Sequence, residues 1–152
     1  MISIKTTLLE QFKTNTAYVL SLFNSVPVEK LHTAYAQGKW TIKEVFQHLI
    51  DTERVFQFRC FCIARGDKTS LPAFNENDYV PASKANSKDI ESLIEEFVAV
   101  RESFMVLLNS LTNEDLQLVG NVNNKNQSAS ATAFFVLEHY LWHINIIKER
   151  YL

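Results

Sequence analysis

The chain has 152 residues, of which 47% are apolar and 21% charged, and its formal net charge at pH 7 is −2. This length and balance indicate one globular domain, residues 1–152, with enough apolar material for a core. No basic stripe favours binding to nucleic acid, and no apolar run has the roughly 20 residues that cross a bilayer. No secretion signal opens the chain. Cys60 and Cys62, two residues apart on a helix, point about 160° apart and therefore cannot bridge. We therefore expect a cytoplasmic protein with reduced thiols.

Four long segments carry apolar residues at a spacing of three to four, which indicates amphipathic helices. The second of them opens on Thr41-Ile42-Lys43-Glu44, the pattern of a capping box, and Gly66 follows its expected end. The last has Lys148 and Arg150 near its C-terminus, where the helix dipole favours positive charge. The expected helices cover residues 3–25, 41–65, 86–111 and 130–150.

The connections differ in length and composition. Residues 66–86 contain Pro72 and Pro81 together with aromatic side chains that favour packing, so we expect a packed loop that covers a pocket. Thr112 opens a second capping pattern that predicts one short helical turn, and residues 120–130 are rich in Asn and Ser and are expected to form a loop. No segment shows the alternation of a strand. The predicted fold is all-α, a four-helix bundle.

His139 and His143 lie four residues apart in the last expected helix. Side chains at this spacing project from the same face of a helix and are one turn apart, as two ligands of one metal ion must be. The alternative is a pair of hydrogen-bonded or surface histidines without a metal. The spacing is that of a zinc-protease helix, but Tyr140 stands where that motif needs its general base, so the pattern does not indicate a protease.

A third histidine, His48, lies on the second expected helix beside its apolar stripe. Its face carries polar and apolar residues, which suits the wall of a pocket, although a surface histidine without a role would look the same. Three neutral imidazoles from facing helices bind Zn²⁺ or Ni²⁺ well and leave positions open for water or substrate. None of these three histidines has a Glu three residues before it, which argues against a di-iron site. Asp51, one turn from His48, is the candidate catalytic base or orienting carboxylate, and a plain surface carboxylate is the alternative.

Three stretches of the sequence resemble the DinB-like family: GKWTIKEVFQHLIDTERVF (Gly38–Phe56), RGDKTSLPAFNENDYV (Arg65–Val80) and EHYLWHINIIKERYL (Glu138–Leu152). Members of that family are four-helix bundles, often homodimers. They hold a divalent metal by one histidine on the second helix and two from an H-x-x-x-H on the last. The matching residues here are His48, His139 and His143. Trp142 departs from the pattern, because related proteins often carry an adjacent second histidine at that position.

The resemblance implies a divalent metal, Zn or Ni, and a small-molecule substrate. Some relatives look like thiol-dependent S-transferases or isomerases in which the metal activates a low-molecular-weight thiol, and others are labelled only as metal-dependent hydrolases. We therefore expect a metal-dependent enzyme of the thiol S-transferase or hydrolase type, forming a homodimer. The alternative is a non-catalytic, metal-binding or dimerising stress-related bundle protein.

Overall fold

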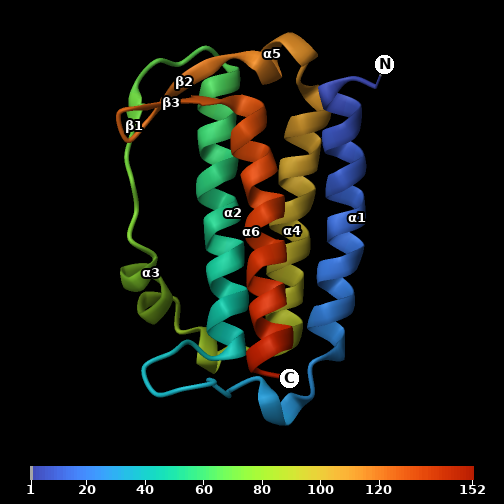
Figure 1. Ribbon diagram of the computed structural model, residues 1–152, viewed down its shortest axis with the longest axis vertical. Helices are drawn as coiled ribbons and strands as arrows, with labels where there is room; N and C mark the ends of the chain where they lie inside the picture. Colours follow the sequence, from blue (N-terminus) through green and yellow to red (C-terminus); the bar gives the residue numbers. More distant parts are fainter. Residues whose placement is uncertain (1) are drawn as a thin grey trace.

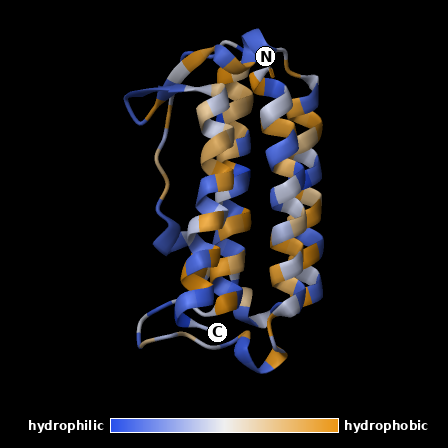
Figure 2. Ribbon diagram, turned by 45° about the vertical axis from the view of Figure 1, so that its right-hand side comes forward, coloured by the Kyte–Doolittle hydropathy of each residue, from blue (hydrophilic) through white to orange (hydrophobic). Residues whose placement is uncertain are grey.

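Four long helices pack around one apolar core in the computed structural model, which describes residues 2–152 (Figure 1). Apolar residues recur along each long helix (Figure 2). The buried ones form one continuous core cluster. The predicted four-helix bundle is confirmed. The long helices are α1 (Ile4–Ser25), α2 (Ile42–Ala64), α4 (Ile90–Ser110) and α6 (Ala129–Arg150). In residues 2–152 no helix is both long and apolar enough to cross a bilayer.

The helix starts follow local capping chemistry. Thr41 and Glu44 form the predicted capping box of α2, in which each side chain bonds to the backbone of the other. The second capping pattern opens the short helix α5 (Asn113–Gln117), as expected. The third long helix begins later than predicted. Residues Ala85–Ser87 form a separate 3₁₀ turn, η2, and Lys88 is extended, so α4 starts only after Asp89.

A small three-stranded sheet occupies one end of the bundle, where the sequence predicted only loops. Strands β2 (Val119–Val122) and β3 (Lys125–Ser128) form an antiparallel hairpin, and β1 (Ser70–Leu71) pairs parallel with β2. Asn123 and Asn124 both have positive φ, which is the requirement of a tight hairpin turn. The expectation of a loop over 120–130 is therefore wrong. These strands are short and polar. They are recognised by the backbone hydrogen bonds between them, because their sequences show no alternation of apolar and polar residues.

The order of helix directions is set by a long crossover. Figure 1 shows α1 and α6 running one way and α2 and α4 the other, so the chain must return along the whole bundle between α2 and α4. Residues 65–89 make this return. They contain α3 (Glu76–Ser83), which packs against α2, so the expected packed segment holds a helix as well as loops. The short connection after α1 contains the 3₁₀ turn η1 (Val28–Lys30).

A buried ion pair lies inside the core. The Arg101 guanidinium on α4, with 1% of its surface exposed, donates to both carboxylate oxygens of Glu53 on α2, at 2.9 and 3.0 Å. Its remaining terminal nitrogen donates to Asn15 Oδ1 and Thr16 Oγ1 on α1. The ring of Tyr140 on α6 lies 5.0 Å from the guanidinium carbon. This one side chain thus connects all four long helices.

Candidate metal centre

Helices α2 and α6 share the most extensive helix–helix contact in the bundle and bring three histidines together. His48 comes from α2, and His139 and His143 come from successive turns of α6. In residues 2–152, they form the only group of three or more His, Cys, Asp or Glu side chains close enough to share one ion. The structure therefore gathers the three histidines that the sequence analysis singled out.

The Nε2 atoms of the three rings converge. His139 Nε2 lies 3.0 Å from His48 Nε2 and 3.1 Å from His143 Nε2, and all three ligand atoms lie within 4.8 Å of one another. Two nitrogens that each bind one Zn²⁺ at about 2.0–2.1 Å are separated by about 3–3.4 Å when the ligand angles are near tetrahedral. The two short separations fit that range, and the donor set of three imidazoles suits Zn²⁺ or Ni²⁺.

Aromatic side chains hold the three rings in place. Trp40 packs on His48 with ring centroids 4.8 Å apart, and Trp142 meets His143 edge-on at 4.7 Å. Phe135 stacks on His139 at 5.5 Å. These contacts restrict each imidazole to an orientation that directs Nε2 towards the other two.

The histidines are neutral at physiological pH. Burial lowers the pKa of His48 to about 4. Burial, followed by the charges that His143 and His48 would carry, lowers the pKa of His139 to about 3. The pKa of His143 falls to about 4, mainly through burial. Neutral imidazoles keep a lone pair free for a metal, so protons do not compete for these ligands near pH 7.

A buried hydroxyl lies behind His48. Thr52 Oγ1, one turn along α2, lies 3.5 Å from His48 Nδ1. When a hydroxyl accepts from an Nδ1–H group, the Nε2 lone pair of the ring is available to a metal.

A pocket of about 320 Å³ opens beside the cluster. His143 lines it together with Trp40, Trp142 and Asn77 of α3. The crossover thus contributes to the wall, in agreement with the expected pocket cover. Tyr79, the exposed aromatic residue of α3, borders other hollows instead.

Asp51 is directed towards a different neighbour. Its Oδ1 accepts a hydrogen bond from Gln47 Nε2 at 2.9 Å, and Gln47 also binds Glu96 on α4. Within residues 2–152, no hydrogen bond or ion pair joins Asp51 to the histidines. Its catalytic role stays a prediction.

Glu76 is a carboxylate that the sequence analysis missed. It stands in the first turn of α3 and is close enough for its charge to raise the pKa of His143 against the effect of burial. No spacing along the chain could have shown this, because α3 reaches the cluster through the crossover.

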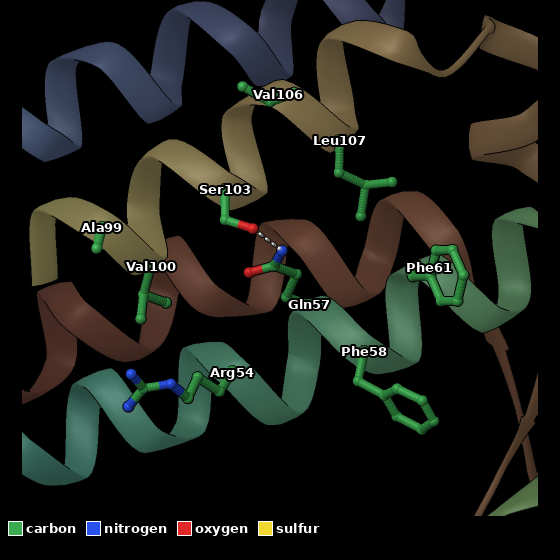
Figure 3. Close-up of a pocket in the computed structure, with 9 residues that line it drawn as sticks. All are labelled: Arg54, Gln57, Phe58, Phe61, Ala99, Val100, Ser103, Val106 and Leu107. Atoms are coloured by element: carbon green, nitrogen blue, oxygen red, sulfur yellow. Dashed lines mark hydrogen bonds between the residues drawn. The ribbon is translucent and has the colours of Figure 1, made fainter. Parts of the chain in front are cut away.

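A larger groove lies elsewhere. It has a volume of about 650 Å³ between α2 and α4, and residues such as Phe58, Phe61 and Val106 line it (Figure 3). A hydrogen bond from Gln57 to Ser103 crosses it. None of its lining residues is His, Cys, Asp or Glu, so its chemistry does not match that of the histidine cluster.

Sequence relatives carry names that refer to metal-dependent hydrolysis. A protein of Oceanobacillus iheyensis named "putative metal-dependent hydrolase" is 27% identical over 142 residues, covering 91% of this chain and 82% of the relative. A protein of Geobacillus thermodenitrificans with the same kind of name is 27% identical over 115 residues, and the match spans 76% of this chain and 64% of that relative.

Solved structures show the same fold. YfiT from Bacillus subtilis, described as a probable metal-dependent hydrolase with an unusual four-helix bundle topology, matches with a TM-score of 0.76 and 18% identity over 96% of this chain and 86% of its own. A mycothiol-dependent maleylpyruvate isomerase matches with a TM-score of 0.75 and 11% identity, over 94% of this chain and 62% of its own. The model of the DinB superfamily matches residues 11–147. The chain therefore belongs to the DinB superfamily.

Proposed function

We propose that the protein binds one divalent metal ion, Zn²⁺ or Ni²⁺, through His48, His139 and His143, and uses it in a hydrolase or thiol S-transferase reaction on a small molecule. The convergence of three neutral Nε2 atoms carries this proposal. The names of the sequence relatives support the metal-dependent part of it.

Three protein ligands leave positions open around the ion, which is the arrangement of catalytic rather than structural zinc sites. When bound, such an ion supplies Lewis acidity and lowers the pKa of a coordinated water or thiol. The Thr52 hydroxyl contacts His48 Nδ1, and the aromatic neighbours fix the ring directions. The pocket beside His143 admits the substrate.

A general base must come from the surrounding chain. Glu76 is the better placed of the two carboxylates, because its neighbour Asn77 lines the pocket beside His143, whereas Asp51 accepts a hydrogen bond from Gln47. We propose that Glu76 accepts a proton from the nucleophile. Replacement by Gln keeps the size of the side chain and removes its basicity.

The primary test is metal content and binding. Protein purified without chelator should hold close to one Zn or Ni per chain, and His143→Ala should lose it. Zn²⁺ at about 100 times its dissociation constant should stabilise the wild type by about 2.7 kcal/mol and leave His143→Ala unchanged. A wild type that gains no stability from either metal would overturn the proposed centre.

Catalysis needs a separate measurement. A screen of small electrophiles with several low-molecular-weight thiols, and of small esters and amides with water, should reveal turnover that a chelator abolishes. Glu76→Gln should lower that turnover about a hundredfold while metal content stays the same, and Asp51→Asn should have a smaller effect. Metal binding without any chelator-sensitive turnover would instead favour a non-catalytic metal protein.

A further inference from the structure

Two positive side chains line the pocket beside His143. They are Lys39 and Arg150, and no Asp or Glu is among the lining residues. Within residues 2–152, neither cation forms an ion pair with a carboxylate, although the charge of Glu76 acts on His143. Two neighbouring cations outside any ion pair create a local field that favours an anion.

Both cations are held at the same aromatic ring. The guanidinium carbon of Arg150 lies 5.2 Å from the centre of the Tyr35 ring, and its Nη1 donates to the Tyr35 hydroxyl at 3.1 Å. Lys39 Nζ lies 6.0 Å from the same ring centre. Tyr35 meets Tyr151 edge-on, with centroids 5.2 Å apart. These contacts keep the positive ends at the pocket while leaving most of their hydrogen-bond donors free.

Other residues that line the pocket are suited to a flat, apolar group. Both indole rings of the protein, Trp40 and Trp142, line this pocket, and each packs against a histidine of the cluster. Indole rings bind planar ligands by stacking and edge contacts. A volume of about 320 Å³ lies at the small end of the range for pockets that take small molecules.

We infer that this pocket is the substrate subsite and that it selects a planar or aromatic small molecule bearing a carboxylate. Lys39 and Arg150 bind the carboxylate, the two tryptophans hold the planar body, and the other end of the ligand reaches His143. This inference rests on the proposed metal centre for its catalytic meaning, but the subsite itself consists of residues that do not bind the metal. Arg150 is the main determinant, because its planar fork matches both oxygens of a carboxylate.

The test uses phenylacetate and its neutral isostere phenylacetamide as probes. Since both tryptophans line the pocket, tryptophan emission reports binding there directly. Titrations are carried out on the full chain, with and without chelator. Phenylacetate should bind about fivefold to tenfold more tightly than phenylacetamide, and ionic strength of about 1 M should remove most of this difference.

Variants separate the subsite from general charge. Arg150→Gln and Lys39→Gln should each weaken phenylacetate about threefold to fivefold and leave phenylacetamide unchanged. Lys148→Gln is the matched control, because Lys148 stands on the same last turns of α6 but donates to Tyr18 outside the pocket. It should bind phenylacetate like the wild type.

The two proposals fail in different ways. The preference for phenylacetate should persist in chelator-treated protein, so loss of metal binding alone would overturn the metal centre and not the subsite. Equal binding of acid and amide would overturn the subsite. So would a lack of saturable emission change, an unchanged phenylacetate affinity in Arg150→Gln, or an equal loss in Lys148→Gln.

Discussion

Two groups of polar side chains lie inside this bundle, the Arg101–Glu53 ion pair and the histidine cluster. They differ in how far other side chains of the protein supply their hydrogen bonds. Arg101 donates to Glu53, Asn15 and Thr16, so the charge of the core pair is neutralised and its hydrogen bonds are made within the protein. The histidine cluster instead directs three ring nitrogens at one another, and neutral imidazoles have at most one proton to share between each pair.

The contrast distinguishes a group that stabilises the fold from a group that can bind a ligand. A buried ion pair whose charges neutralise each other within the chain needs no ligand, and it fixes how the helices pack. In the histidine cluster, by contrast, ring nitrogens from α2 and α6 converge at separations of 3.0 and 3.1 Å, which also suit the ligands of one divalent cation. Zn²⁺ and Ni²⁺ match such nitrogen donors.

Breaking the core pair should have the largest effect on folding. In Arg101→Met, the Glu53 carboxylate is left buried without its partner, which should lower the free energy of unfolding by about 3–5 kcal/mol. Urea denaturation followed by circular dichroism measures this. Below its melting temperature, the variant should still bind one metal ion.

The double variant Arg101→Met/Glu53→Leu is the control for charge. Since it removes both ions, it should recover most of the lost stability. A double variant as unstable as the single one would show that packing around Arg101, and not the unpaired carboxylate, determines the result.

The pH dependence of the unfolding free energy should test the histidine cluster in the same way. The unfolded chain binds protons on its histidines near pH 6.5, whereas the folded, metal-free chain binds them only near pH 3–4. The unfolded state therefore holds more protons between these values. The unfolding free energy of the metal-free protein should fall by at least about 2 kcal/mol as the pH drops from 6.5 to 4.

His139→Gln isolates this effect from the titration of carboxylates. It removes the histidine with the lowest pKa, so its stability should decline less steeply over the same pH window. Urea midpoints at matched pH values give the comparison. Parallel curves for the two proteins would contradict the assignment of the acid sensitivity to the cluster.

The smallest of the expected effects concerns Thr52. In Thr52→Val, His48 Nδ1 loses the hydroxyl that contacts it, but the helix and the packing volume are kept. Zinc affinity should fall about tenfold, as is typical when a partner behind a metal-binding histidine is removed. Competition with a chromophoric chelator measures this, and Thr16→Val serves as a control for loss of a threonine hydroxyl elsewhere. An unchanged affinity in Thr52→Val would show that Thr52 does not orient His48.

The long helices and part of the site could be predicted because both depend on periodicity. The spacing of His139 and His143 places them on one face of any helix that contains them. Thr41 and Glu44 marked the start of α2 for the same local reason. His48 was a weaker inference from residues alone, because its wheel position beside the apolar stripe suits several roles.

The remaining features depend on contacts that no periodicity encodes. The hairpin of β2 and β3 is too short and too polar to show alternation. Asp51 is close to His48 on a helical wheel, but α2 lies between α4 and α6, and this small angular offset turns Asp51 towards Glu96 on α4. Glu76 reaches the site only because the crossover returns along the bundle.

The crossover, residues 65–89, is also longer than is needed to return along the length of α2. At 1.5 Å per residue, α2 is about 34 Å long, whereas residues 65–89 could extend to about 80 Å. The surplus is folded into α3 at the rim of the metal centre. A bundle with this order of helix directions therefore carries a folded segment beside the pocket. Lengthening or shortening that segment would change the wall of the pocket and leave the four long helices unchanged.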